Sequence, residues 1–312
     1  MSSTTAAGWA TGALGVRLGD DRLYLKPEQL QKTGSFKPRG MTNRIATLPD
    51  SAKAAGVITL SAGNAGQAYA WAGRSAGVAV TVVMPAAAVR SKVEACRGYG
   101  ARVVLHGVHI GETFAEMERI RDAEGLELVH PFDDPAVIAG HGSIGLELLE
   151  DIPELDVVVV GVGGGGLICG IAAALKERRP AVRVYGVEPE RSNALSIALE
   201  RDEIVRIQPE SVADGLGAPF AGAWTLAMAR RYLDGILLLD DPTILAGMRF
   251  AVERLKQVLE PAGSAALAAV LAGRVPIRDG ERVAVVLSGG NVEVDRIGEL
   301  LAAAGSFPAA AR

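Results

Sequence analysis

Residues 31–40 read QKTGSFKPRG, a stretch in which a lysine stands between a Gly-Ser turn and a proline. Glycine and serine allow the backbone to turn sharply. Proline is favoured at the start of a helix because its missing N–H needs no partner there. We therefore expect Lys37 at the beginning of a helix. A lysine held there and partly removed from water can act as an amine nucleophile; a solvated surface lysine is the alternative.

The composition is that of a globular protein with one or two domains. Of the 312 residues, 49% are hydrophobic, 22% are charged and 4% are aromatic, and the net charge is −4. These values support full cores and show no basic footprint for a nucleic acid. Cys96 and Cys169 suit a reducing compartment. The sequence shows no signal-peptide pattern, and it has no apolar run of the roughly 20 residues that a membrane helix needs. We therefore expect a cytoplasmic protein without a membrane segment.

Strand-like and helix-like segments alternate along the chain, which predicts βαβ units and parallel sheets. The expected strands are residues 22–26, 57–60, 78–83, 102–105, 126–129, 156–160, 182–187 and 283–287. The expected helices are residues 65–75, 91–99, 113–124, 135–150, 166–179, 242–259, 263–271 and 292–304, with two more near Ala194 and Ala227. Residues 190–235 otherwise show no clear period.

The alternating segments fall into two α/β lobes. We expect a small domain at residues 43–136 and a large domain made of residues 1–42 and 137–312, without an appended regulatory domain. In open α/β sheets, ligands bind beyond the carboxyl ends of the strands. The glycine-rich turns after Leu60, Val160 and Leu287 all follow expected strands, so these turns are the candidate binding elements.

The turn after Val160 reads GVGGGG at residues 161–166. Bare glycine N–H groups and the positive end of the following helix attract a phosphate. One hypothesis is a dinucleotide site of an NAD-dependent enzyme, because the glycines fit G-x-G-x-x-G and Glu188 ends the next strand. The other is pyridoxal phosphate (PLP), which has a phosphate for the glycines and an aldehyde for Lys37. Only the PLP hypothesis accounts for Lys37, and glycines that serve packing alone are the third interpretation.

Two further turns carry polar groups at strand ends. Residues 61–67 read SAGNAGQ and open a helix, so that free N–H groups and the Ser61 hydroxyl can bind a carboxylate. Residues 288–291 read SGGN and place the neutral Ser288 hydroxyl after the last strand. Each turn alone is compatible with an ordinary helix cap. Together with residues 31–40 and 161–166, they favour a PLP site.

With these motifs, the chain resembles the fold-type II PLP enzymes, a two-lobed fold like that of the tryptophan synthase β subunit, and within them the serine/threonine dehydratase and serine racemase family. The matching segments are distributed along nearly the whole chain. They are residues 33–37, 61–64, 131–135, 163–167, 213–215, 260–263 and 288–291.

The resemblance implies a role for each site residue. Lys37 is the Schiff-base lysine, and Phe36 lies under the cofactor ring. Asn64 forms a hydrogen bond with the ring hydroxyl, and Ser288 faces the pyridine nitrogen. The catalytic residues are Lys37 and Ser288. The phosphate group is held by Gly163, Gly164, Gly165, Gly166 and the N–H of Leu167. The substrate is held by Ser61, Ala62, Gly63, Asn64 and Ala65.

The implied reaction is β-elimination from a hydroxy amino acid, L-threonine or L-serine, to a 2-oxo acid and ammonia. Lys37 removes the α-proton as a neutral amine. A serine at position 288 leaves the ring nitrogen neutral, which disfavours a long-lived carbanion and suits elimination. Racemases have a second serine, and thus a second acid/base, at the position of Ala62. We therefore predict an ammonia-lyase of the threonine/serine dehydratase type.

Several alternatives remain open at this stage. The same scaffold serves 3-hydroxyaspartate and other hydroxy amino acid dehydratases, serine racemase-like enzymes and β-replacement enzymes, and a PLP- or amino-acid-binding sensor is the non-catalytic alternative. Racemases and some relatives bind a divalent ion through a Glu and an Asp six residues on. Glu188 fits the first position, but Ala194 stands at the second. We therefore expect no divalent metal site, while a monovalent cation held by carbonyls is compatible. We also expect a homodimer and structural or solvent-facing positions for His130 and His141.

Overall fold

The computed structural model describes residues 22–307. The described part of the chain divides into two compact units, one made of residues 31–141 and the other of residues 22–30 and 142–307. The smaller unit is thus wider than the domain predicted at 43–136, because it also includes residues 31–42 and 137–141. Lys37 therefore belongs to the smaller unit, although the sequence placed it with the larger domain.

The larger unit contains a five-stranded sheet in which every pair of neighbours is parallel. The strand order is β1-β9-β6-β7-β8. The strands are β1 (Leu23–Pro27), β6 (Val157–Gly161), β7 (Arg183–Pro189), β8 (Gly235–Leu239) and β9 (Val283–Leu287). The helices are α8 (Gly166–Arg178), α9 (Ala194–Arg201), α10 (Ala223–Tyr232), α11 (Asp241–Phe250), α12 (Pro261–Leu271) and α13 (Val294–Ala303). Helix α7 (Pro135–Asp151) begins in the smaller unit and ends in the larger one.

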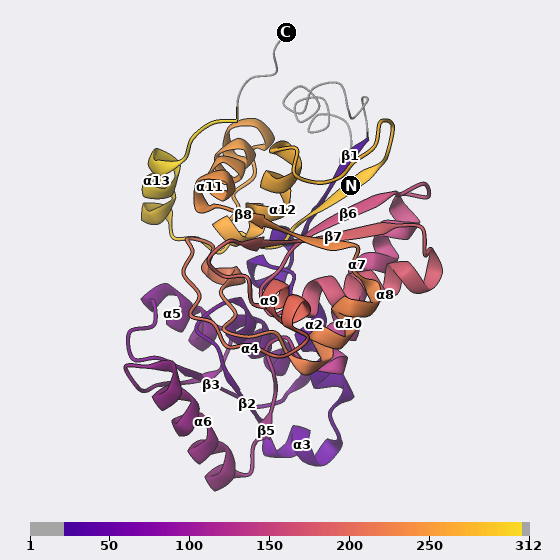
Figure 1. The fold of residues 1–312 in the computed structure, drawn as a ribbon. Helices are drawn as coiled ribbons and strands as arrows, with labels where there is room; N and C mark the ends of the chain where they lie inside the picture. The colour runs from indigo at the N-terminus through magenta and orange to yellow at the C-terminus, as the bar shows by residue number, and fades with distance from the viewer. Residues whose placement is uncertain (1–21, 308–312) are drawn as a thin grey trace. The chain divides into compact units, whose positions relative to one another are not determined.

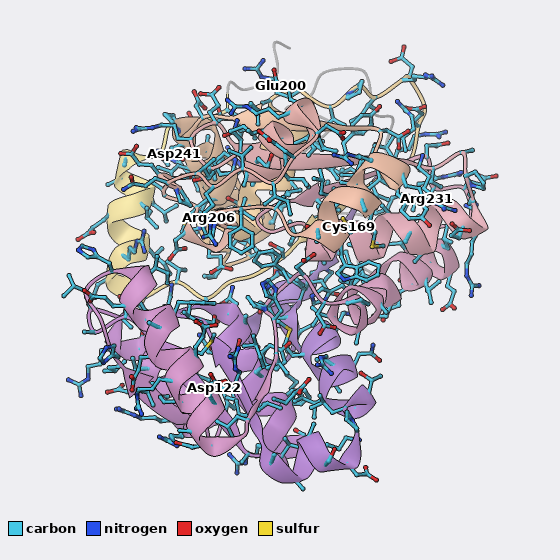
Figure 2. The ribbon with its side chains drawn as sticks, turned by 60° about the horizontal axis from the view of Figure 1, so that its bottom comes forward. Asp122, Cys169, Glu200, Arg206, Arg231 and Asp241 are labelled. Carbon is cyan, nitrogen blue, oxygen red and sulfur yellow. The ribbon has the colours of Figure 1, made fainter. Side chains whose placement is uncertain are left out.

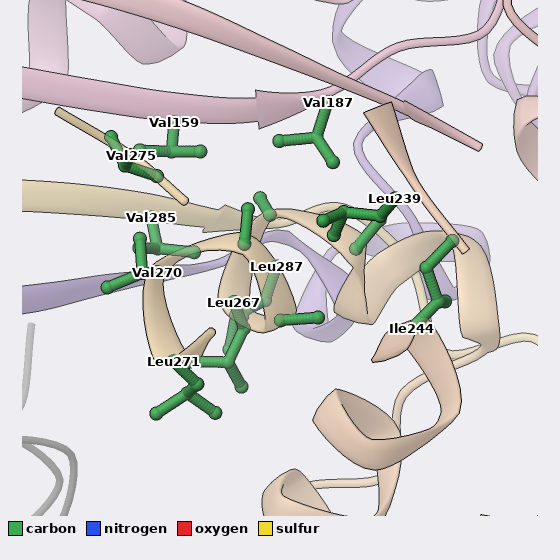
Figure 3. Close-up of a cluster of buried hydrophobic side chains, with 14 of the residues drawn as sticks. Val159, Val187, Leu239, Ile244, Leu267, Val270, Leu271, Val275, Val285 and Leu287 are labelled. Atoms are coloured by element: carbon green, nitrogen blue, oxygen red, sulfur yellow. The ribbon is translucent and has the colours of Figure 1, made fainter. Parts of the chain in front are cut away.

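Helices cover this sheet on two faces, with α11 and α12 on one face and α8, α9 and α10 on the other (Figure 1). All eleven residues of α12 are buried. Eight of them, Ala262 and residues 265–271, pack in one apolar cluster with Val159, Val187 and Val285 of the sheet (Figure 3). A buried aliphatic side chain contributes roughly 1.5–3 kcal/mol relative to an exposed one. The cluster therefore makes the sheet edge beneath the glycine-rich turns a rigid support.

The smaller unit also has three layers, with helices on both faces of the parallel sheet β4-β3-β2-β5. Its strands are β2 (Val57–Leu60), β3 (Val80–Met84), β4 (Arg102–Leu105) and β5 (Glu127–Leu128). Its helices are α2 (Lys37–Thr47), α3 (Asp50–Ala55), α4 (Asn64–Ala76), α5 (Arg90–Gly98) and α6 (Ile110–Glu124). Because strand side chains alternate between faces, Val82 joins the cluster of α2, α4 and α5, while Val83 packs with α6.

Polar and apolar side chains are sorted between the outside and the inside of each unit. Figure 2 shows Asp122 and Arg231 at the surface of their units, where both side chains are largely exposed. Cys169 is buried in α8, and its Sγ donates to the Thr225 carbonyl oxygen at 3.3 Å. Among residues 22–307, the structure has no helix whose length and hydropathy would let it span a bilayer.

The strands and helices expected from the sequence are confirmed, apart from shifts of a few residues at their ends and one correction. The predicted helix 242–259 is too long: α11 ends at Phe250, and a π-helical segment follows to Leu255. Lys256 then adopts a left-handed conformation with φ of 57°, which ends a helix. The edge strand β8 was not predicted, because its four apolar residues carry no period that separates a strand from a helix.

The close contact of α12 with the turn after β9 generates a first prediction. A Cβ atom on Gly263 would lie 2.0 Å from the Gly289 carbonyl oxygen, so Gly263→Ala forces the backbones apart. We expect a loss of about 1–3 kcal/mol in the free energy of unfolding, measured by urea denaturation.

Gly298→Ala in α13 is the matched control, because a Cβ there meets no atom within 4 Å. It should stabilise the protein by roughly 0.5–1 kcal/mol, the helix advantage of alanine over glycine. Equal effects of the two substitutions would contradict the packing described for Gly263.

Candidate active site

The predicted site residues divide between the two units. Phe36, Lys37 and residues 61–65 belong to the smaller unit, whereas residues 163–167 and Ser288 belong to the larger one. Residues 61–65, residues 163–167 and Ser288 follow the carboxyl ends of strands, whereas Phe36 and Lys37 lie at the start of α2.

Lys37 is the first residue of α2, as the sequence predicts, and Phe36 is the N-cap. The chain arrives there through Thr33 and Gly34, which have φ angles of 63° and 71°. A left-handed conformation is unfavourable for a β-branched residue such as threonine, and strain of this kind gathers at functional sites. Lys37 is half-buried. Its Nζ donates to the Pro131 carbonyl oxygen at 2.9 Å and lies 5.0 Å from the centre of the Phe36 ring.

His141 lies beneath this segment and is completely buried. Its ring packs edge-on against the Phe36 ring, with 4.8 Å between the ring centres. A Cβ on Gly40 would lie 2.5 Å from His141 Cε1, so only glycine lets α2 approach this imidazole. Burial, together with the charges of Lys37 and Arg39, holds the pKa of His141 well below its usual value. His141 is thus a neutral packing residue, in agreement with a structural position.

The turn from β2 into α4 is capped by its own serine. Ser61 Oγ accepts from the Gly66 N–H at 3.0 Å and from the Gly63 N–H at 3.3 Å. A hydroxyl that accepts two hydrogen bonds still has a proton to donate. Residues 61–64 are half-buried, and Ala65 is 5% exposed. The helix start therefore retains the partial positive charge that attracts a carboxylate.

The turn after β6 depends on glycine at two positions. Gly165 has φ of +90°, and a Cβ there would lie 2.9 Å from the Thr225 Cβ. A Cβ on Gly163 would lie 3.2 Å from the Leu216 Cα. The first intrahelical bond of α8 runs from the Cys169 N–H to the Gly165 carbonyl. The N–H groups of the first helical turn have no partner within the helix, so this cradle fits a phosphate group.

Ser288 lies at the same edge of the sheet as this cradle. Strands β9 and β6 are parallel neighbours in which Val159 pairs with Val285, and Ser288 follows the end of β9. Its side chain is 6% exposed, and its Oγ donates to the Ala262 carbonyl oxygen at 3.5 Å, which is a long contact. The larger unit thus combines a glycine cradle with a neutral hydroxyl at adjacent strand ends.

Glu188 lies near the carboxyl end of β7, but its carboxylate is bound by backbone N–H groups of the protein. Its two oxygens accept from the N–H groups of Leu195 and Ser196, each at 2.9 Å, in the first turn of α9. The side chain is completely buried, and burial raises its pKa to about 7 against the lowering effect of these bonds. A carboxylate used in this way is not presented to a ribose. Among residues 22–307, His, Cys, Asp and Glu form no group of three that could hold a metal ion.

Sequence reasoning missed the residues that support the turns from behind. Thr225 lies against Gly165 and holds the start of α10, where its Oγ1 accepts from the Gly222 N–H at 2.9 Å. Leu216 lies against Gly163, and the Pro131 carbonyl receives Lys37. Thr225 falls in the segment where the sequence shows no clear period. Leu216 and Pro131 adjoin or belong to family motifs, but their contacts require the folded chain.

The buried carboxyl of Glu188 generates a prediction about pH. Since its pKa is raised in the folded state, folding favours the protonated form. The resulting stabilisation is present below the ordinary carboxyl pKa of 4.5 and is lost as the pH rises through about 7. We therefore expect the melting temperature of the wild type to fall between pH 5 and pH 8 relative to that of Glu188→Gln. The exposed Glu190→Gln variant should retain the wild-type pH dependence, and a Glu188→Gln profile parallel to that of the wild type would refute the raised pKa.

Comparisons with known proteins identify the family of the chain. Residues 9–289 match the model of the family described as "Pyridoxal-phosphate dependent enzyme". An L-threonine ammonia-lyase of Thermotoga maritima is 41% identical over 280 residues, which are 89% of this chain and 69% of that protein. The structure of threonine deaminase isoform 2 from Solanum lycopersicum matches with a TM-score of 0.89 and 31% identity, covering 96% of this chain and 82% of that one.

A structure of maize serine racemase matches as well, with a TM-score of 0.88 and 32% identity, covering 94% of this chain and 89% of that one. The parallel sheets, the two three-layer units and the glycine cradle agree with these relationships and leave the dinucleotide hypothesis without support. The chain belongs to the PLP-dependent enzyme family and has the fold-type II architecture.

Proposed function

We propose that this protein is a PLP-dependent ammonia-lyase that converts L-threonine, and with it L-serine, into a 2-oxo acid and ammonia. The identity of 41% with an L-threonine ammonia-lyase over 89% of the chain carries this proposal. The reaction removes the α-proton and the β-hydroxyl of the amino acid as water. The enamine that leaves the site then takes up water and loses ammonia, so that the atoms balance.

The smaller unit would supply the lysine and the carboxylate site. Lys37 would hold the cofactor aldehyde through Nζ and, once displaced by the substrate amine, remove the α-proton as a neutral amine. Its position in the first turn of α2 fixes the backbone from which Nζ reaches. The Ser61 hydroxyl and the N–H groups of residues 63–65 would bind the substrate carboxylate, because the start of α4 favours negative charge. Phe36 and Asn64 would contact the cofactor ring and its hydroxyl.

The larger unit would hold the phosphate and the pyridine nitrogen. Gly163 to Gly166 and the N–H of Leu167 would hold the phosphate, and Cβ atoms on Gly163 and Gly165 would instead meet Leu216 and Thr225. Ser288 would share a hydrogen bond with the ring nitrogen without charging it. When bound, PLP supplies the electron sink for the charge that remains on the α-carbon. A neutral hydroxyl partner limits that sink, which favours prompt loss of the β-hydroxyl over reprotonation.

The methyl group of Ala62 supports a lyase over a racemase, because it has no proton to give to the opposite face of the substrate. Dehydration of 3-hydroxyaspartate or other hydroxy amino acids and β-replacement use the same groups and are the alternative activities. The proposal further includes a cytoplasmic homodimer and a monovalent cation held by main-chain carbonyls. Sedimentation of the purified protein and a comparison of activity in potassium and in a bulky organic cation test these two parts.

A substrate panel tests the proposed reaction. We expect 2-oxo acid and ammonia in equal amounts from L-threonine and L-serine, and Lys37→Ala should lower kcat by at least about 10³-fold because the general base is lost. The exposed Lys32→Ala variant should retain wild-type turnover. Full activity of Lys37→Ala would refute the assigned base, and α-proton exchange with inversion of the substrate would contradict the inference from Ala62.

Gly165→Ala tests the phosphate cradle. The added methyl group meets Thr225 and requires a left-handed alanine, which distorts the turn. We expect the variant to fold but to lose most of its bound PLP during gel filtration. The visible absorbance per protein chain measures this loss. Gly111→Ala, where a Cβ meets no atom within 4 Å, is the control and should retain PLP. Wild-type PLP content in Gly165→Ala would place the phosphate elsewhere.

A further inference from the structure

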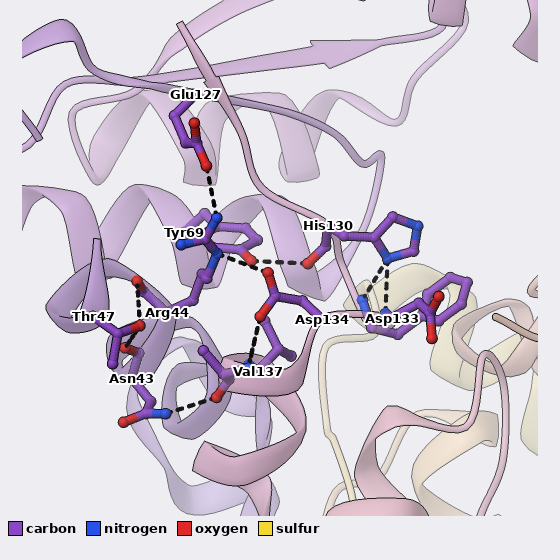
Figure 4. Close-up of polar contacts among 11 residues, drawn as sticks. Asn43, Arg44, Thr47, Tyr69, Glu127, His130, Asp133, Asp134 and Val137 are labelled. Carbon is purple, nitrogen blue, oxygen red and sulfur yellow. Dashed lines mark hydrogen bonds and ion pairs between the residues drawn. The ribbon is translucent and has the colours of Figure 1, made fainter. Parts of the chain in front are cut away.

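His130 begins the short turn 130–134 and binds the backbone of that turn with its own ring. Its Nδ1 accepts from the Asp133 N–H at 2.8 Å and from the Phe132 N–H at 3.3 Å (Figure 4). A backbone N–H can only donate, so Nδ1 must carry a free lone pair. The ring is therefore neutral, with its proton on Nε2. Protonation of Nδ1 would place an N–H against two N–H donors and break both hydrogen bonds.

The rest of the turn is anchored to the helices of the smaller unit. The Tyr69 hydroxyl of α4 donates to the His130 carbonyl oxygen at 2.8 Å. Asp134 caps α7, since its Oδ1 accepts from the N–H groups of Ala136 and Val137. Arg44 of α2 reaches Asp134 Oδ2 through its Nε at 2.7 Å. The two ends of the turn are thus fixed, and the imidazole determines the path of the backbone between them.

The turn presents one group to Lys37. The Pro131 carbonyl oxygen belongs to the same peptide group as the Phe132 N–H, which His130 binds. It accepts from Lys37 Nζ at 2.9 Å. A proline contributes no backbone N–H of its own, so the N–H groups of Phe132 and Asp133 are the nearest donors in the turn. By binding these two donors, the ring of His130 orients the carbonyl on which the Lys37 amine rests.

We propose that His130, as the neutral Nε2–H tautomer, is a positioning residue that shapes the 130–134 turn. It thereby determines where Lys37 Nζ is held by its hydrogen bond to the Pro131 carbonyl oxygen. The functional part of this inference depends on the proposed role of Lys37. The hydrogen bonds of His130 themselves do not depend on it.

The charges around His130 decide how it responds to pH. Burial and the positive charge of Lys37 lower its pKa, whereas Asp133 and Asp134 oppose that shift. The ring packs edge-on against Phe132, with 4.5 Å between the ring centres. The net lowering keeps the acceptor form in the folded protein. The stabilisation it gives is present above the ordinary histidine pKa of about 6.5 and is lost as the pH falls through the lowered value.

Imidazole NMR of the ¹⁵N-labelled holoenzyme tests the tautomer directly. The protein has four histidines, and the signal that disappears in His130→Asn belongs to His130. We expect a neutral ring with the proton on Nε2 at pH 7, with a pKa below the ordinary histidine value. An Nδ1–H tautomer or a charged ring at pH 7 would overturn the proposal.

Two substitutions separate positioning from mere packing. Asparagine can place its Oδ1 where the histidine has Nδ1 and does not titrate, whereas alanine leaves the two N–H groups without that acceptor. We expect His130→Ala to lower kcat by at least about tenfold, since small misplacements of a reacting group cost this much or more. His130→Asn should restore most of kcat and retain it further into acid than the wild type. Equal impairment of the two variants, or none in His130→Ala, would overturn the proposal.

A readout without turnover separates this proposal from the proposed function. The pH titration of the visible absorbance of the lysine-bound cofactor reports the surroundings of Lys37 Nζ. We expect the midpoint of this titration to shift in His130→Ala and to stay near the wild-type value in His130→Asn. His109→Asn is the matched control and should keep the wild-type midpoint. If no amino acid is turned over but this pattern appears, the positioning role stands and the proposed reaction fails. Identical titrations in all variants overturn the positioning role, whatever the activity.

Discussion

The parallel arrangement of the strands is the constraint on which the rest of the structure depends. In each sheet, every described pair of neighbouring strands runs in the same direction. Every strand-to-helix turn of a sheet therefore falls at the same edge. That geometry brings the glycine cradle and Ser288 to adjacent strand ends in the larger unit. It also places the Ser61 turn at the carboxyl edge of the smaller sheet.

Close backbone approach is the second constraint, and it explains where glycine is indispensable. Gly40 lets α2 reach the buried His141, and Gly165 lets the cradle pass Thr225 in a left-handed conformation. In each case a Cβ would lie within 3 Å of a neighbouring atom. The N–H groups of the first turn of α8 have no partner within the helix. Packing and anion binding thus depend on the same residues, which is why such turns tolerate little change.

Much of the fold could be read from periodicity, because buried parallel strands and amphipathic helices leave strong patterns. The apolar run of β6 and the helix that begins at Lys37 are examples. The end of α11 and the strand β8 could not be predicted in this way. Lys256 stops its helix by a backbone conformation that its side chain does not encode, and the five residues of β8 are too few to show a period. Likewise, residues 31–42 pack with the smaller unit, although nothing in their composition assigns them to it.

The sequence by itself determined the family and the candidate chemistry, since a lysine before a proline, a tetraglycine turn and Ser288 are local patterns with a chemical meaning. Only the tertiary structure decided what the other polar side chains do. Glu188 lies near the end of β7, where a ribose-binding acid is expected, yet its carboxylate binds the first turn of α9. His130 accepts two backbone N–H groups beside the carbonyl that receives Lys37. Hydrogen-bond partners are set by distances between atoms in the folded chain, and spacing along the sequence does not contain them.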